Sequence, residues 1–381
     1  MAPAATETPD TSVSPSERSE TPIDTFLTGL CKFEPLPNVR TILITGGAGF
    51  IGSWVTRHLV RQYAETYNVI CLDKMDVVAS LNNILDLFTC PNFRFLHCDL
   101  NDQDTVLFAL QTYRVDCVLH FAASSHVQNS FSDPFTFTRN NVLGTQSLLE
   151  AVRSYGKVTR FIHVSTDEVY GETNGQMATE AFTPMRPTNP YSASKAAAEM
   201  YVMAYQKSFG LPAIIVRSNN VYGPGQYPEK IIPRFTGLML KGHKLTLQGN
   251  GDNARRFLYG ADAADAFDTI LHKGEVGEIY NVDSRYEITN RKVAAMILEL
   301  FGHDPVKGFS NMVAWLPDRP FNDNDYAVDG SKLQALGWTQ KINFDTGLAM
   351  TVDWYRKHMA TWWHYHYAQD GKQLVAESFP V

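Results

Sequence analysis

The chain contains 381 residues, of which 33 are basic and 40 are acidic, so its formal net charge is −7. This acidic balance argues against a nucleic-acid-binding protein, because phosphate contacts need a basic face. Apolar residues form 44% of the chain, yet no apolar run reaches the roughly 18 residues of a membrane span. We therefore expect a soluble globular protein with a large core, no membrane anchor and no nucleic-acid partner.

The first part of the chain has the composition of a leader. Residues 1–25 are rich in Pro, Ser, Thr and acidic side chains, and they lack the apolar stretch of a secretory signal. We predict a disordered leader over residues 1–38, in which residues 26–38 carry enough apolar side chains to pack loosely on the domain behind them.

From residue 40, short apolar strands alternate with helices. Strands are predicted at 41–45, 69–72, 93–98, 115–121, 160–165 and 213–217, and helices at 53–63, 102–113, 134–155 and 191–209. This alternation is typical of an α/β fold with a Rossmann-like, doubly wound parallel sheet. We assign the sheet domain to residues 39–218. The mixed, Gly-punctuated pattern of residues 219–381 predicts mainly a smaller substrate-binding lobe, interleaved with the sheet.

The cysteines indicate a reducing compartment. There are five, an odd number without C-x-x-C spacing, and they are Cys31, Cys71, Cys90, Cys98 and Cys117. A disulfide framework or a structural zinc site needs a different pattern. We expect free and mostly buried thiols, no bound metal and a cytoplasmic location.

A glycine-rich loop follows the first predicted strand. Its sequence, Gly46-Gly47-Ala48-Gly49-Phe50-Ile51-Gly52, matches G-x-G-x-x-G and opens a predicted helix. Such glycines permit a sharp turn and a close approach of the backbone to a pyrophosphate. Asp73 ends the second strand, 21 residues beyond Gly52, where a ribose-binding acid is expected. A carboxylate there repels a 2′-phosphate, so NAD is favoured over NADP, although Lys74 beside it weakens that argument.

A tyrosine and a lysine lie one helical turn apart. Asn189 and Pro190 are good residues for a helix start, so Tyr191 and Lys195 are expected on one helix face. A nearby ammonium lowers the pKa of a phenol and would make Tyr191 a base. The alternative is an ordinary surface pair, which the upstream nucleotide loop disfavours.

These motifs resemble an extended short-chain dehydrogenase/reductase and, within it, a nucleotide-sugar 4,6-dehydratase. The resemblance covers about residues 40–340 and includes the segments 120–126, 165–171, 219–224 and 318–323. The Thr166-Asp167-Glu168 run separates it from sugar epimerases of the same fold, which usually lack the paired acids. Arg319-Pro-Phe-Asn-Asp323 is similar to the plant and fungal UDP-glucose dehydratases that begin rhamnose synthesis.

The resemblance implies an NAD-dependent lyase that converts UDP-glucose into UDP-4-keto-6-deoxyglucose. In this scheme C4 is oxidised, water is eliminated across C5 and C6, and the hydride returns to C6. Tyr191 takes the C4 hydroxyl proton with the help of Lys195, and Thr166 binds the C4 oxygen. Glu168 removes the C5 hydrogen, and Asp167 protonates the departing C6 hydroxyl.

The resemblance also implies the remaining contacts. NAD is expected to contact Gly46, Gly49, Phe50, Ile51, Gly52, Asp73, Asp99, Leu100, Phe121, Ala122, Ala123, Tyr191 and Lys195. The nucleotide sugar is expected to contact Ser125, Thr166, Asn220, Lys230, Arg255, Asn281, Arg319 and Asn322. A guanidinium suits the bidentate binding of a diphosphate.

Other functions and the partners are left as expectations. A dTDP-glucose 4,6-dehydratase is the main alternative, followed by a nucleotide-sugar 4-epimerase and a non-catalytic NAD-binding regulator on the same fold. By resemblance the helices at 134–155 and 191–209 form a homodimer. Since the sequence ends at Val381, we expect the downstream epimerase/reductase to be a separate protein.

Overall fold

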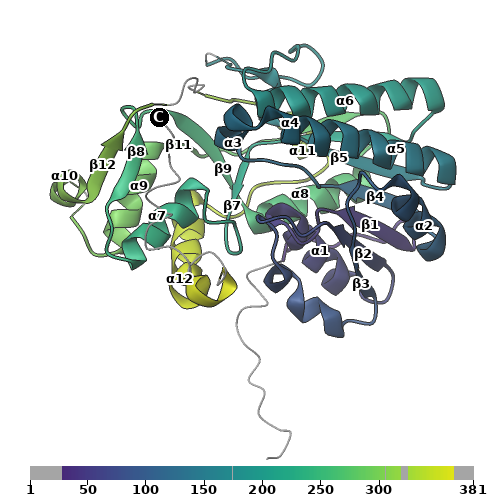
Figure 1. Ribbon diagram of the computed structural model, residues 1–381, viewed down its shortest axis with the longest axis horizontal. Helices are drawn as coiled ribbons and strands as arrows, with labels where there is room; N and C mark the ends of the chain where they lie inside the picture. Colours follow the sequence, from purple (N-terminus) through teal and green to yellow (C-terminus); the bar gives the residue numbers. More distant parts are fainter. Residues whose placement is uncertain (1–27, 174, 305, 319–324, 364–381) are drawn as a thin grey trace, which may run out of the picture.

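A parallel sheet forms the centre of the computed structural model, which describes residues 28–173, 175–304, 306–318 and 325–363 (Figure 1). The seven-stranded sheet has the order β10-β6-β5-β4-β1-β2-β3, and its paired strands are all parallel. The strands are β1 (Thr41–Thr45), β2 (Asn68–Asp73), β3 (Phe93–His97), β4 (Cys117–His120), β5 (Arg160–Thr166), β6 (Ala213–Ser218) and β10 (Ile279–Val282). The order reverses between β1 and β4, and such a switch point opens a crevice at the carboxyl ends of the strands.

Helices cover both faces of the sheet, as the alternating pattern predicts. One face carries α1 (Phe50–Gln62) and α8 (Gly260–Lys273), and the other carries α2 (Gln103–Tyr113), α5 (Gly144–Tyr155) and α6 (Pro190–Phe209). Side chains of a strand alternate between the two faces. In β1, Ile42 and Ile44 therefore enter one hydrophobic core and Leu43 enters the other.

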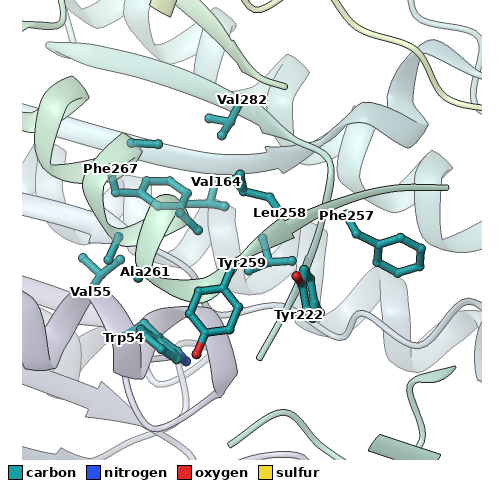
Figure 2. Packing of buried hydrophobic residues seen from close by; sticks show 14 of the residues in the cluster. Trp54, Val55, Val164, Tyr222, Phe257, Leu258, Tyr259, Ala261, Phe267 and Val282 are labelled. Atoms are coloured by element: carbon teal, nitrogen blue, oxygen red, sulfur yellow. The ribbon is translucent and has the colours of Figure 1, made fainter. Parts of the chain in front are cut away.

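The C-terminal part of the chain returns to the sheet. The α8 helix packs on α1, and Figure 2 shows Trp54 and Tyr259 side by side at this contact. Their rings meet edge to face with centroids 5.6 Å apart. A Cβ at Gly260 would lie 2.6 Å from the Trp54 ring, so only glycine permits this approach. Both α8 and β10 follow residue 218 in the chain, yet α8 packs on the sheet beside α1 and β10 is the edge strand of the sheet. The two predicted parts of the chain are therefore interleaved.

A smaller lobe lies beside the sheet, on the left of Figure 1. Its strands are β7 (Asn220–Tyr222), β9 (Ala254–Tyr259) and β11 (Glu287–Thr289) in one sheet, and β8 (Leu245–Gln248) and β12 (Val313–Leu316) in another. Its helices are α7 (Ile231–Leu240), α9 (Asn290–Leu300), α10 (Lys307–Met312) and α12 (Phe344–Trp362). The short helices α3 (Val127–Ser132), α4 (Pro134–Phe137) and α11 (Ser331–Ala335) lie in the connections. None of the described helices is long and apolar enough to cross a membrane.

The helix predicted at 134–155 is not one regular helix. It begins with α4, continues as a π-helical turn over Thr138–Leu143 and ends as α5. The apolar spacing does not reveal the turn, because a π-turn only inserts one extra residue into a continuous helical run. The strand predicted at 115–121 is shorter, since only Cys117–His120 pair with neighbouring strands.

Residues 28–38 belong to the packed domain, although the sequence assigned them to the leader. The backbone N–H groups of Leu30 and Cys31 donate to Asp265 Oδ1 at 2.6 and 2.8 Å. Phe33 N donates to the Tyr63 hydroxyl at 2.8 Å. These tertiary partners replace regular secondary structure, and the packing agrees with the expectation that residues 26–38 contact the domain through their apolar side chains. The remaining leader, residues 1–27, lies outside the described residues.

The cysteine prediction is confirmed: all five thiols are free, and Cys71, Cys98 and Cys117 are buried. One Cys-His-Asp group lies away from the sheet crevice, with Cys31 Sγ and His58 Nε2 at 3.3 and 3.1 Å from Asp268 Oδ2. The Tyr63 hydroxyl donates to the same oxygen at 2.9 Å. These donors satisfy the carboxylate of Asp268 as a hydrogen-bonded cluster.

Candidate active site

A cavity of about 450 Å³ opens at the carboxyl ends of the sheet strands and is closed on the other side by the lobe. It is lined by the predicted NAD contacts Gly46, Gly49, Phe50, Ile51, Gly52, Asp73, Asp99, Leu100, Phe121, Ala122 and Ala123. It is also lined by Thr166, Asp167, Glu168, Tyr191 and Lys195, and by Ser125, Asn220, Lys230 and Arg255. The structure therefore brings the predicted catalytic residues, the predicted nucleotide contacts and these four predicted substrate residues into one continuous space.

The glycine loop is held in a form that only glycine can take. Gly46 has φ = +71°, and a Cβ there would lie 2.6 Å from the backbone nitrogen of Ala122. A Cβ at Gly52 would lie 2.2 Å from the carbonyl oxygen of Gly46. The loop thus packs against the end of β4 and opens the amino end of α1, which is a favourable position for a pyrophosphate.

Asp73 lies beside this loop. Its Oδ2 accepts from Ala48 N at 3.0 Å, and its Oδ1 accepts from Met75 N at 2.8 Å. Burial raises the pKa of Asp73, while these backbone N–H groups oppose the rise. Lys74, which weakened the preference for NAD, pairs with Asp76 at 3.2 Å and donates to Asn140 at 3.1 Å.

The paired acids follow β5 directly. Thr166 ends the strand, and its hydroxyl accepts from Glu168 N at 3.3 Å as the cap of a 3₁₀ turn over Asp167–Tyr170. The same hydroxyl donates to Asp167 Oδ1 at 3.0 Å. Glu168 Oε2 accepts from the side chain of Asn189 at 3.2 Å. The tight turn therefore directs both carboxyl groups into the cavity with separate partners.

The two acids have unlike electrostatic surroundings. Asp167 is 3% exposed, and burial followed by the charge of Glu168 raises its pKa to about 7. Hydrogen bonds from Asn219 and Thr166 and the charge of Arg255 oppose this rise. A carboxylic acid that is still protonated near neutrality can act as a proton donor, and an ionised neighbour can act as a base.

Tyr191 and Lys195 lie on the first turns of α6, as predicted. The helix begins with a capping box, in which Asn189 Oδ1 accepts from Ser192 N at 2.8 Å. Lys195 Nζ donates to the Val164 carbonyl at 2.6 Å, and burial lowers its pKa to about 8. The expectation that the pKa of Tyr191 is lowered is wrong for the unliganded protein. Burial, followed by the charge of Glu168, raises that pKa above its usual value.

Basic side chains line the part of the cavity that faces the lobe. Lys230 Nζ donates to the Ser125 carbonyl at 2.9 Å and so links the lobe to the loop after β4. The Arg255 guanidinium lies 4.9 Å from the ring centre of Tyr326. Arg234 on α7 also lines the cavity, and sequence reasoning missed it. These cations suit a negatively charged diphosphate.

Of the other predicted substrate residues, only Asn281 is described, and it is not part of this arrangement. Asn281 is fully buried in β10, where its Oδ1 accepts from the Tyr170 hydroxyl and its Nδ2 donates to the carbonyls of Ala178 and Asp329. Its amide supports the fold and does not line the cavity, because these three hydrogen bonds hold it in the packed interior beside the edge strand β10. Arg319 and Asn322 lie outside the described residues.

Two asparagines at the site were not assigned to it from the sequence. Asn189 was expected only as a helix cap, and Asn219 only as the first residue of the family segment 219–224, without a role at the site. Asn219 Nδ2 donates to Asp167 Oδ2 at 2.6 Å. The one available signal was the position of Asn219 immediately after β6, because strand ends meet at this edge of the sheet.

Comparisons with known proteins identify the family and relatives of this chain. The family model described as GDP-mannose 4,6 dehydratase matches residues 43–351. A trifunctional UDP-glucose 4,6-dehydratase/3,5-epimerase/reductase of Arabidopsis thaliana is 48% identical over 326 residues, 85% of this chain and 48% of that protein. The chain thus spans about half the length of the plant relatives that it matches. A dTDP-D-glucose 4,6-dehydratase of Mus musculus is 42% identical, over 90% of this chain and 94% of that protein.

Solved structures show the same fold. A dTDP-glucose 4,6-dehydratase of Streptomyces venezuelae, crystallised with NAD, has a TM-score of 0.80 and 38% identity over 84% of this chain and 98% of that chain. A UDP-glucose 4-epimerase of Thermus thermophilus, also with NAD, has a TM-score of 0.75 and 34% identity over 84% and 99%. The Rossmann-like fold predicted from the sequence is confirmed.

Proposed function

Since the chain belongs to the GDP-mannose 4,6 dehydratase family, we propose that it is an NAD-dependent hydro-lyase that converts UDP-glucose into UDP-4-keto-6-deoxyglucose. The observation that carries this proposal is the pair Asp167 and Glu168, held in different environments at the wall of the cavity that also holds Tyr191. Epimerisation needs no acid pair for water loss, whereas dehydration needs a proton donor and a base close together.

The glycine loop supports NAD as the cofactor. A Cβ at Gly46 would collide with the backbone of Ala122, and one at Gly52 would collide with the Gly46 carbonyl, so the close-packed turn of the loop needs glycine at both positions. In the proposal this loop binds the pyrophosphate, Asp73 the adenosine ribose and Asp99 the adenine. When bound, NAD accepts a hydride from C4 of the sugar and returns it at C6.

Tyr191 is the proposed base for the C4 hydroxyl. Its raised pKa means that the phenol holds its proton in the unliganded protein. The hydrogen bond with Thr166 opposes this rise. In the proposal the ammonium of Lys195, one helical turn away, also favours the phenolate when the substrate hydroxyl approaches. Thr166 then holds the C4 oxygen through its hydroxyl.

The acid pair carries the elimination. The C4 ketone acidifies the C5 hydrogen, and Glu168 takes this proton. The electron pair of the C5–H bond forms the C5=C6 double bond, while the C6–O bond breaks. Asp167 gives its proton to the departing hydroxyl, so that water leaves. The raised pKa of Asp167 supports this role, because the acid remains partly protonated near pH 7.

The preference for UDP over dTDP rests on the sequence. The plant relatives, whose names include UDP-glucose 4,6-dehydratase, are 46–48% identical, whereas the mouse dTDP-D-glucose dehydratase is 42% identical. The Phe321-Asn322-Asp323 stretch points the same way.

Measuring kcat/KM for UDP-glucose and dTDP-glucose side by side tests this preference. The donors differ by a thymine methyl and a ribose 2′-hydroxyl, and a single methyl is worth only ~1–3 kcal/mol, about 10–200-fold in rate. We expect UDP-glucose to be favoured at least about tenfold. An advantage for dTDP-glucose contradicts the donor assignment and leaves the dehydratase chemistry standing. Formation of the C4 epimer favours the epimerase alternative, and no turnover of either donor favours the regulator.

The proposal includes a homodimer in the cytoplasm. The exposed Met200, Tyr201 and Met203 on α6 support a subunit contact, and the five free thiols support a reducing compartment. The 4-keto-6-deoxy product requires epimerisation and reduction before it becomes a rhamnose, and we propose a separate protein for these steps.

A further inference from the structure

A buried asparagine outside the predicted catalytic set controls the geometry of Asp167. We infer that Asn219 is a positioning residue that places the transferable proton of Asp167 on Oδ1, the oxygen that faces Thr166. This inference rests on the proposed function, in which Asp167 is the acid that protonates the departing hydroxyl. It extends that function by naming the oxygen that delivers the proton and the residue that selects it.

The orientation of the Asn219 amide is determined by the backbone around it. Its Oδ1 accepts from Ser284 N at 3.0 Å, and its own backbone N–H donates to the Val282 carbonyl at 3.1 Å. An amide whose oxygen is engaged in this way presents its NH₂ group on the other side. That group meets Asp167 Oδ2 at 2.6 Å, and Asn219 is 3% exposed.

The two oxygens of Asp167 therefore have different partners. Oδ2 faces an NH₂ group, which can only donate, so this oxygen is best kept as a bare acceptor. Oδ1 faces the Thr166 hydroxyl at 3.0 Å, and a hydroxyl can donate or accept. When Asp167 takes up a proton, the form with the proton on Oδ1 keeps both hydrogen bonds. The form with the proton on Oδ2 weakens the bond from Asn219.

The groups around Asp167 determine how its titration responds. Glu168 on the same turn disfavours a negative charge on Asp167, and Arg255 on β9 favours it. Tyr191 on α6 holds its proton and is neutral, and the charge of Asp167 contributes to the raised pKa of that phenol. Asn219 is a neutral donor that favours the ionised carboxylate. Its removal is therefore expected to raise the pKa of Asp167. Because Asp167 must be protonated to act as an acid, the alkaline limb of the kcat profile should move to higher pH.

The test compares pH profiles of kcat for the holoenzyme and two variants. Asn219→Asp retains an acceptor for Ser284 N but faces Asp167 with a second carboxylate, so the two must share a proton. We expect its alkaline limb to rise by about one pH unit or more, with kcat reduced about tenfold at the wild-type optimum. The KM for the sugar nucleotide should change less than about threefold, because Asn219 acts through Asp167. Asn219→Ser, which removes the amide NH₂ group and shortens the side chain, should shift the limb in the same direction by a smaller amount.

Asn92→Ser is the matched control. Asn92 is also buried, but its amide donates to the carbonyls of Val60 and Tyr67, away from the cavity. We expect this variant to lose thermal stability and keep the wild-type pH profile. The inference is overturned if both Asn219 variants keep the wild-type limb and kcat. If Asn219→Asp fails to fold, Asn219→Ser decides.

A second readout does not depend on turnover. The carboxylic acid band of Asp167, identified by infrared difference against Asp167→Asn, should persist to higher pH in Asn219→Ser than in the wild type. An unchanged titration contradicts the inference even if the enzyme is active. Absence of dehydratase activity in the wild type contradicts the proposed function instead, and the infrared titration then still tests the role of Asn219.

Discussion

Asp167 and Glu168 are adjacent in the chain and both carry a carboxyl group, but the two side chains lie in different surroundings. Asp167 is buried and its pKa is raised to about 7, whereas Glu168 is partly exposed and binds the amide of Asn189. An aspartate with a raised folded-state pKa binds more protons in the folded than in the unfolded state between about pH 4 and 7. Its contribution to stability is therefore complete below the unfolded pKa and is lost as the pH rises toward 7.

Asp167→Asn should separate activity from stability. We expect the variant to oxidise C4 and exchange the C5 hydrogen with solvent, yet to lose water about 10²–10⁴-fold more slowly. It should also unfold at a higher temperature than the wild type at pH 8, because no buried charge remains. Deuterium exchange at C5 and a thermal melt measure both effects. Glu168→Gln should instead be impaired already at C5 exchange, and wild-type rates in both variants would exclude the mechanism.

For single residues, the sequence predicted which side chains line the cavity better than it predicted their electrostatics. The catalytic set from Thr166 to Lys195 could be named because the motifs are local. The raised pKa of Tyr191 could not be predicted from the sequence, because it depends on how deeply the folded chain buries this side chain. The bond between Asn219 and Asp167 joins residues 52 positions apart in the chain, so no local pattern announces it.

Among the secondary-structure elements, the turn from β1 into α1 restricts the choice of residues most, because it needs glycine at Gly46 and Gly52. The helix begins at Phe50, inside the glycine-rich segment, and its first turn packs against the carbonyl of Gly46. The loop could be predicted from the sequence because this spacing of glycines is typical of such a turn. The π-helical turn before α5 and the strand β10 could not be predicted from the sequence. Neither changes the apolar pattern, and β10 is only four residues long.

Gly52→Ala should remove the cofactor and leave the sheet folded. The added Cβ would lie 2.2 Å from the Gly46 carbonyl oxygen, so the loop must move away from its present path. We expect at least about a tenfold loss of NAD affinity, measured by the nucleotide released on heat denaturation. Gly144→Ala is the control, because its nearest neighbour would be 3.6 Å away. This helical variant should retain NAD and gain roughly 0.5–1 kcal/mol of stability. Equal NAD content in both variants would contradict the assigned role of the loop.

At the scale of the whole molecule, residues of both the sheet domain and the lobe line the cavity. Lys230 from the lobe reaches the Ser125 carbonyl after β4, and α8 and β10 bring the C-terminal half back onto the sheet (Figure 1). The sequence predicted two interleaved parts but placed Asn281 in the cavity. That error arose because the position of a residue across a sheet depends on strand pairing, which the motif does not contain.

In the proposed mechanism, one sugar molecule is oxidised at C4 and reduced at C6 by the same bound cofactor. The most direct measurement uses UDP-glucose carrying deuterium at C4, with the purified protein and no added reductant. We predict that the product is a 4-keto-6-deoxy sugar that carries this deuterium at C6, with solvent hydrogen at C5. Deuterium returned to C4 in an epimer, or recovered in free NADH at one equivalent per turnover, would contradict the claim.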